Sequence, residues 1–230
     1  MEFNAEILVR ENIKQMKAYS SARDEFSGEA RIFLDANENS FGSPLPNPSD
    51  KDGLEVMYNR YPDPLQTELK EKIAQIKGVP PKNIFLGNGS DEAIDLLFRV
   101  FCEPGLDNVI ILPPTYGMYE VCAGMNNVRL KKVPLTSGFQ LNLEAIEDAI
   151  DSNTKIIFVC SPNNPTGNSI NRGDIEILLN NFDGLVVIDE AYINYAKQKT
   201  FITELTEYPN LVIMQTFSKA WGLAGLRLGM

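Results

Sequence analysis

The sequence predicts an α/β fold with a mainly parallel sheet that is covered by helices on both faces. Two observations lead to this prediction. Short runs rich in Val, Ile and Leu recur along the chain, and stretches with a helical spacing of apolar residues separate most of them. Alternation of apolar strands with helices is typical of parallel sheets that are buried between two helical layers.

The elements are predicted in the following order. Residues 1–30 predict an arm with a short helix, and residues 43–52, rich in Pro, Ser and Asp, predict a loop. Strands are predicted at Asn83–Leu86, Asn108–Leu112, Val128–Val133, Lys155–Cys160, Leu185–Ile188 and Leu211–Met214. Helices are predicted at Thr67–Lys77, Asp91–Phe101, Tyr116–Gly124, Leu143–Ile150 and Asp174–Asn181.

The composition excludes several classes of function. The net charge of −10 over 230 residues argues against nucleic acid and anionic membranes as partners. Histidine is absent, so no histidine can act as a base or a metal ligand, and no metal is expected. The three cysteines have neither disulfide nor zinc spacing, which predicts buried thiols in a reducing compartment. With no signal-peptide core and no apolar run of about 20 residues, we expect a cytoplasmic protein.

One lysine stands in a chemically suggestive setting. The segment T-F-S-K-A-W-G-L-A-G-L-R, residues 216–227, follows the predicted strand Leu211–Met214. A lysine at the mouth of a buried strand can lose its proton and act as a nucleophilic amine. The hydroxyl groups, glycines and Arg227 near Lys219 suit a phosphate, and the combination predicts a Schiff base with pyridoxal phosphate. Taken alone, the motif also fits a surface lysine in a loop.

A glycine-containing motif, G-N-G-S-D-E at residues 87–92, connects a predicted strand to a predicted helix. Ser90 is a suitable N-cap, and Asp91 and Glu92 favour the first helical turn. The glycines let the backbone approach a ligand, and the N–H groups can hold a phosphate. The motif is neither a Walker loop nor a dinucleotide fingerprint, and an ordinary capped turn is the alternative.

Two further motifs follow predicted strands. In P-P-T-Y-G-M-Y, residues 113–119, Tyr116 could stack on a flat heterocycle or belong to the core. In C-S-P-N-N-P-T-G, residues 160–167, Asn164 could present an amide donor to a cleft or bond to its own turn.

The last motif, V-V-I-D-E-A-Y at residues 186–192, ends a buried strand with an acid. A buried carboxylate such as Asp189 requires a cation or a hydrogen-bond donor, and a protonated pyridine nitrogen is one. The motif also fits the magnesium-binding acid of a nucleotide hydrolase, but the chain has no Walker loop to support that function.

Together the motifs predict one site, because ligands of parallel sheets bind beyond the carboxyl ends of the strands. Asp189 is predicted to keep the ring nitrogen of the cofactor protonated. Asn164 and Tyr192 can bond the ring oxygen, and Tyr116 can cover one face of the ring. Lys219 is predicted to form the imine and then to move a proton between substrate and cofactor carbons. The predicted phosphate-binding residues are Ser90, Asp91 (through its backbone N–H), Ser218 and Arg227.

The motifs S-P-N-N-P-T-G, V-I-D-E-A-Y and S-K-A-W-G-L-A-G-L-R resemble those of fold-type-I pyridoxal-phosphate aminotransferases. Within this family the chain is similar to the histidinol-phosphate aminotransferases, from about residue 10 to its last residue. The motifs that carry this closer similarity are Y-S-S-A-R-D-E (19–25), L-D-A-N-E-N (34–39), R-Y-P-D-P (60–64) and G-N-G-S-D-E (87–92).

The resemblance implies transfer of an amino group between L-histidinol phosphate and 2-oxoglutarate in histidine biosynthesis. It also implies a homodimer with shared active sites, in which Tyr61 reaches the cofactor phosphate of the neighbouring subunit and Tyr19 lies near the substrate. Residues 1–40 would form an arm and the start of a small domain, and residues 41–230 an incomplete large domain. The family's enzymes are longer, so we expect the small C-terminal domain, with its substrate-binding arginines, to be missing.

Three alternatives to this function remain open at the level of the sequence. They are an aromatic amino-acid aminotransferase, a lyase similar to threonine-phosphate decarboxylase, and a cofactor-binding fragment without turnover. Release of carbon dioxide would identify the lyase, and a cofactor spectrum that does not change with an amino donor would identify the inactive fragment.

Overall fold

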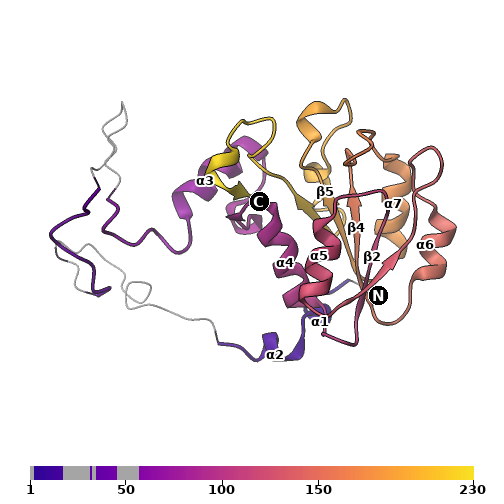
Figure 1. The fold of residues 1–230 in the computed structure, drawn as a ribbon, viewed down its shortest axis with the longest axis horizontal. Coiled ribbons are helices and arrows are strands. Elements are labelled where there is room, and N and C mark those ends of the chain that lie inside the picture. The colour runs from indigo at the N-terminus through magenta and orange to yellow at the C-terminus, as the bar shows by residue number, and fades with distance from the viewer. Residues whose placement is uncertain (1–2, 18–31, 33–34, 46–56) are drawn as a thin grey trace.

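The computed structural model describes residues 3–17, 32, 35–45 and 57–230 (Figure 1). The described part contains a five-stranded sheet in the order β3-β2-β4-β5-β6, in which all neighbours are parallel. Its strands are β2 (Asn108–Ile111), β3 (Arg129–Lys132), β4 (Thr154–Cys160), β5 (Leu185–Asp189) and β6 (Leu211–Met214). The predicted α/β class with a parallel sheet is confirmed.

Helices cover both faces of this sheet, as Figure 1 shows. Side chains alternate between the two faces along each strand. In β4, Ile156 and Phe158 pack in the cluster that contains residues of two helices, α4 (Ser90–Phe101) and α5 (Met118–Met125). The alternate residues, Ile157 and Val159, pack on the side of α6 (Leu143–Ala149) and α7 (Arg172–Asn181). Burial of both faces explains why the strands read as continuous apolar runs.

A short antiparallel pair joins two distant segments beside this sheet. β1 (Gly87–Asn88) pairs with β7 (Leu228–Gly229), and Gly87 lies opposite Gly229. On its other side β7 bonds to the residues that follow β6, because the N–H of Phe217 donates to Leu228 O at 3.0 Å. β7 therefore fixes both ends of the segment that carries Lys219.

The predicted strand Asn83–Leu86 is wrong. Residues Pro81–Asn83 form the 3-10 turn η1, and strand pairing begins only at Gly87. Ile84 and Leu86 are buried against α3 (Thr67–Lys77), which explains their strand-like apolar pattern. The remaining strands and helices from Thr67 onward agree with the predictions to within about two residues.

The described part of the N-terminal arm contains two short helices, α1 (Ala5–Leu8) and α2 (Glu11–Lys14), where one was predicted. Arg10 ties this arm to the end of α4: its N–H donates to Val100 O at 2.9 Å, and its Nε pairs with Glu103 at 3.1 Å. The predicted loop at residues 43–52 is irregular at 43–45 and otherwise lies outside the described residues. Other short 3-10 turns are η2 (Ile193–Tyr195), η3 (Phe201–Glu204) and η4 (Ala224–Leu226).

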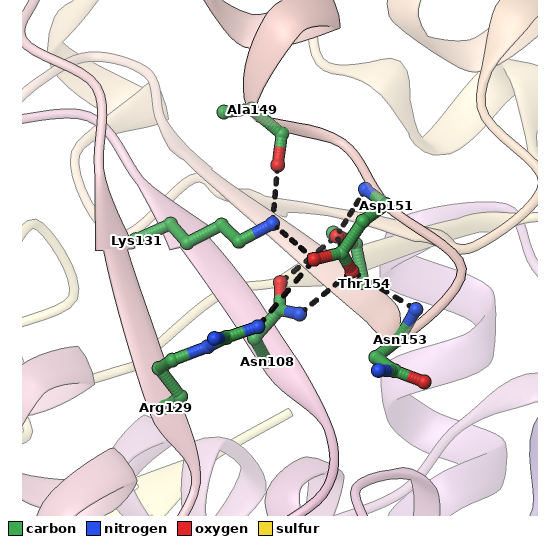
Figure 2. Close-up of polar contacts among 7 residues, drawn as sticks. All are labelled: Asn108, Arg129, Lys131, Ala149, Asp151, Asn153 and Thr154. Carbon is green, nitrogen blue, oxygen red and sulfur yellow. Dashed lines mark hydrogen bonds and ion pairs between the residues drawn. The ribbon is translucent and has the colours of Figure 1, made fainter.

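A polar network ties together the amino ends of β2, β3 and β4 (Figure 2). Its centre is the Asp151 carboxylate, which accepts hydrogen bonds from Lys131 Nζ at 2.7 Å and from Asn108 Nδ2 at 2.9 Å. Arg129 reaches the same carboxylate at 3.4 Å, and the hydroxyl of Thr154 donates to Asn108 Oδ1 at 2.8 Å. The hydrogen bonds that Asp151 accepts from Lys131, Asn108, Asn153 and Thr154 lower its pKa, and the bond from Lys131 is the largest cause.

The cysteines are buried and unpaired, as the sequence predicts: Cys102, Cys122 and Cys160. Burial raises the pKa of their thiols to about 12, 11 and 12, respectively. In the described part of the chain, no helix is long and apolar enough to cross a membrane. No group of three or more metal-binding side chains occurs among the described residues.

Candidate functional site

A pocket of about 190 Å³ lies beyond the carboxyl ends of β4, β5 and β6. Because these strands are parallel, their following loops meet at one edge of the sheet. The pocket is lined by predicted site residues from the five motifs at 87–92, 113–119, 160–167, 186–192 and 216–227: Ser90, Asp91, Tyr116, Asn164, Asp189, Tyr192, Ser218, Lys219 and Arg227.

The N-terminus of α4 forms one end of the pocket. The predicted N-cap, Ser90, is wrong by one residue, because Gly89 is the N-cap and Ser90 is the first helical residue. Gly89 has a φ of 76°, a conformation that a residue without a side chain adopts easily. Ser90 and Asp91 consequently lie in the first turn, where backbone N–H groups have no acceptor within the helix.

Arg227 lies against this helix N-terminus, although it is distant in the sequence. The N–H of Gly89 donates to Arg227 O at 2.7 Å, next to the β1–β7 pair. A Cβ on Gly89 would lie 2.6 Å from Arg227 Nη2, so a side chain at this position would displace the guanidinium. A guanidinium beside a helix N-terminus can attract an anion even in a chain of net charge −10, and Arg227 Nη2 also lies 3.9 Å from Oδ2 of Asp91.

Asp189 is the buried acid of the pocket, with 3% of its surface exposed. Its Oδ2 accepts a hydrogen bond of 2.6 Å from the hydroxyl of Tyr119, and its Oδ1 accepts one of 3.0 Å from the N–H of Ala191. Burial raises the pKa of Asp189, and these hydrogen bonds oppose the rise. The donor that this buried acid needs is therefore Tyr119, which was not among the predicted site residues.

A signal for Tyr119 was present in the sequence. It stands three residues after Tyr116, which is close to one helical turn, and the buried Asp189 required a donor from a neighbouring element. Such spacing does not identify the partner, since Tyr119 lies on α5 and Asp189 at the end of β5, and only the fold brings them together.

Tyr116 and Asn164 line the pocket from two loops. The hydroxyl of Tyr116 donates to Asp91 Oδ1 at 3.1 Å, and burial raises the pKa of Tyr116 to about 12. The neighbouring Asn163 is buried and donates to Pro114 O at 2.8 Å and to Thr166 at 2.7 Å. Asn163 therefore supports the loops, and Asn164 faces the pocket.

Lys219 lies on the segment between β6 and β7, with its Nζ 5.6 Å from the ring centroid of Tyr192. It follows the buried strand β6, as predicted, and its side chain is exposed. The segment lies at the surface, and its anchor is the buried Phe217, whose ring lies 5.4 Å from that of Trp221. Lys77 Nζ is 5.7 Å from the Phe217 ring, which links this segment to α3.

The two remaining predicted residues are not on this pocket. Tyr61 is 69% exposed, and its N–H donates to Glu38 Oε1 at 2.7 Å. Arg60 pairs with the other oxygen of Glu38 at 2.8 Å, so the loop is fixed although the Tyr61 ring is exposed. Tyr19 lies outside the described residues.

Two larger hollows are present in the described structure. One, of about 610 Å³, lies between α4 and the edge of β6, and none of the described residues that line it has a charged side chain. The other, of about 460 Å³, adjoins the predicted site through Asn164 and Tyr192. Among these three pockets of the described residues, the smallest brings Lys219, Asp189 and Arg227 together, so we place the candidate site there.

The sequence pattern of the family described as aminotransferase class I and II matches residues 31–230. The chain belongs to this family. Its residue pattern and its parallel sheet therefore agree with the resemblance inferred from the motifs.

Relatives of this chain within the family are similar to it in sequence and in fold. The chain is 56% identical over 223 residues to histidinol-phosphate aminotransferase of Parabacteroides distasonis. The matched region covers 97% of this chain and 61% of that protein. It thus spans about three fifths of the length of that relative.

Two solved structures extend the comparison. Histidinol-phosphate aminotransferase of Sinorhizobium meliloti, in complex with pyridoxal-5'-phosphate, matches with a TM-score of 0.68 and 28% identity, over 84% of this chain and 54% of that one. L-threonine-O-3-phosphate decarboxylase of Porphyromonas gingivalis matches with a TM-score of 0.62 and 28% identity, over 74% of this chain and 50% of that one.

Proposed function

We propose that this chain carries the pyridoxal 5'-phosphate site of an enzyme that transfers an amino group between L-histidinol phosphate and 2-oxoglutarate in histidine biosynthesis. The observation that carries the proposal is the convergence of Lys219, Asp189 and the Arg227 anion site in one pocket. The 56% identity to a histidinol-phosphate aminotransferase supports the choice of substrate. When bound, the cofactor supplies an electron-accepting ring for the bond-breaking step.

The anion site fits the phosphate of this cofactor. The backbone N–H groups of Ser90 and Asp91 at the start of α4 would donate to phosphate oxygens. Ser218 would add a hydroxyl group and Arg227 a guanidinium, from the segment that β7 fixes beside the helix. The positive end of the helix and the guanidinium both favour a doubly charged anion.

The ring end of the pocket fits a pyridine ring with a hydroxyl substituent. Asp189 would accept a hydrogen bond from the protonated ring nitrogen, which a buried carboxylate favours. Asn164 and Tyr192 would bond the ring oxygen, and Tyr116 would pack on a ring face.

Lys219 would hold the cofactor covalently through its Nζ. Once the substrate amine has displaced it, the freed Nζ of Lys219 would take the proton from the substrate Cα and return it at the cofactor carbon. The exposed position of Lys219 leaves the amine accessible to an incoming substrate.

The assembly and the surroundings of the site are part of the same proposal. We propose a homodimer in which Tyr61 reaches the phosphate site of the neighbouring subunit, and Tyr19 lies near the substrate. The exposed Tyr61 ring, away from the pocket of its own chain, supports this role.

We also propose that residues 1–40 form the arm and the start of the small domain, and that residues 41–230 form the incomplete large domain that binds the cofactor. The buried thiols support a cytoplasmic location.

A lyase similar to threonine-phosphate decarboxylase is the second candidate, because such an enzyme from Porphyromonas gingivalis shares the fold at a TM-score of 0.62. The identity of 28% to that protein, against 56% to a histidinol-phosphate aminotransferase, favours transamination.

The covalent role of Lys219 can be tested by reducing the protein with borohydride in the presence of the cofactor. The wild type is expected to retain the cofactor, and peptide mass spectrometry should locate it on Lys219. Lys219→Ala should retain none, because the neighbouring residues Ser218 and Ala220 have no amine. Lys197→Ala is a matched control, since Lys197 lines only the adjoining hollow. Label on another lysine would contradict the assignment.

The substrate can be tested by incubating the protein with L-histidinol phosphate and 2-oxoglutarate and measuring glutamate. Threonine phosphate, with detection of carbon dioxide, serves as the parallel reaction. Glutamate formation without carbon dioxide supports the proposal. Carbon dioxide release would favour the lyase, and bound cofactor without either product would favour a site that does not turn over.

A further inference from the structure

We propose that Tyr119 is a positioning residue that holds the Asp189 carboxylate in place for the ring nitrogen of the cofactor. The inference rests on the proposed function and deepens it, because Tyr119 does not line the pocket and would act only through Asp189.

The geometry joins two side chains that are almost fully buried. The Tyr119 hydroxyl is 2.6 Å from Asp189 Oδ2, and the exposed fractions are 0% for Tyr119 and 3% for Asp189. Within the described residues, the N–H of Ala191 holds the other oxygen at 3.0 Å. Each carboxylate oxygen can accept two hydrogen bonds, so both donors can stay while the carboxylate accepts another from a ligand.

The phenol of Tyr119 is itself fixed by ring packing. Its ring stacks on Phe158 at 4.8 Å between centroids and meets Tyr116 edge to face at 5.7 Å. Phe158 stacks in turn on Phe98 of α4 at 5.6 Å. Tyr119 therefore has little freedom to turn away from Asp189, and the direction of the carboxylate depends on the core beneath the pocket.

Burial raises the pKa of Asp189, and the hydrogen bond from Tyr119 favours the ionised carboxylate against that effect. Burial raises the pKa of Tyr119 well above its usual value, so the phenol keeps its proton and donates it. Its hydrogen bond lowers the pKa of Asp189 against the effect of burial. The other titratable groups that act on Asp189 or Tyr119 are Asp91, Lys219 and Cys160. Without the phenol, Asp189 would take up a proton more easily and lose the charge that holds the ring nitrogen.

Tyr119→Phe tests the inference, because it removes one oxygen atom and keeps the ring packing. We expect pyridoxal 5'-phosphate to bind the variant about 10- to 100-fold more weakly, as is typical for loss of a hydrogen bond to a charged group. The pH at which the absorption of the bound cofactor changes should also shift by about one unit. Tyr208→Phe is the control, since Tyr208 is a half-buried phenol at the distant apolar hollow.

A double-mutant cycle separates an effect through Asp189 from a general loss of packing. If Tyr119 acts through the carboxylate, adding Tyr119→Phe to Asp189→Asn should change the cofactor Kd by less than threefold. If Tyr119→Phe weakens cofactor binding equally in the wild type and in Asp189→Asn, its role is packing only and the inference is overturned. An unchanged Kd in the single variant Tyr119→Phe would also overturn it. A wild type that binds no cofactor would instead overturn the proposed function and this inference with it.

Discussion

At the residue scale, several pocket residues stand next to a residue whose side chain supports the surrounding loops. Asn164 faces the pocket, whereas Asn163 bonds to two loops. Asp189 faces the pocket, whereas the buried Glu190 accepts hydrogen bonds from Thr200, Phe201 and Gln215. Asn164 and Asp189 could be predicted because they follow strands in recognisable motifs. The Tyr119 partner could not, because it lies 70 residues from Asp189 and only the folded sheet brings them together.

Arg227 should determine the preference of the site for a phosphorylated ligand. Arg227→Ala is expected to weaken binding of pyridoxal 5'-phosphate about tenfold or more, because a charge-assisted hydrogen bond to phosphate is lost. Binding of pyridoxal, which lacks the phosphate, should change little. Equilibrium dialysis measures the Kd of each ligand, and the ratio of the two Kd values gives the preference for the phosphate. Arg172→Ala on α7 is the control. Equal losses for both ligands would show that Arg227 only supports the fold.

At the element scale, the position of the site depends on the short β1–β7 pair. This pair places the segment after β6 beside the N-terminus of α4. The strands of the main sheet could be predicted because they are buried apolar runs. The β1 segment could not, because its two paired residues are Gly87 and Asn88, which carry no apolar strand signal, and their partners lie at 228–229.

Gly229→Ala should disrupt this pair. A Cβ at residue 229 would lie 2.3 Å from the carbonyl carbon of Gly89 and 2.4 Å from the N of Ser90, which are backbone atoms that cannot rotate away. We expect a loss of about 1–3 kcal/mol in the free energy of unfolding, as for overpacking, together with weaker cofactor binding. Urea denaturation measures the loss. Gly225→Ala is the control, because its Cβ would meet no atom within 4 Å; equal effects of both variants would contradict the prediction.

At the scale of the whole molecule, the two ends of the sheet carry different groups of polar residues. The carboxyl ends of the strands hold the candidate site, and the amino ends hold the network around Asp151 (Figure 2). The α/β class could be predicted from the alternation of strands and helices. The strand order and the Asp151 network could not, because both depend on which strands become neighbours, and periodicity within one strand does not determine that.

Asp151→Asn should reduce stability in a manner that depends on pH. The folded-state pKa of Asp151 is lowered, so its contribution is complete above the unfolded value of about 3.9 and is lost as pH falls through the folded pKa. The variant should be less stable than the wild type at pH 7, and the difference should shrink below about pH 4. Urea denaturation at several pH values measures this difference in the free energy of unfolding between wild type and variant. Asp148→Asn on α6 is the control, and a difference independent of pH would contradict the prediction.

The bonds that flank the Lys219 segment also affect its conformational entropy. Phe217 and Leu228 are joined by a backbone hydrogen bond, and Gln215 and Met230 by two, so the ends of the segment are already held together. Each doubling of the length of such a closed loop costs only about 0.6 kcal/mol. Lys219 and Arg227 both lie close to the joined ends. The middle of the loop, around Gly222 and Gly225, can therefore change in length between relatives while the amine and the guanidinium keep their places.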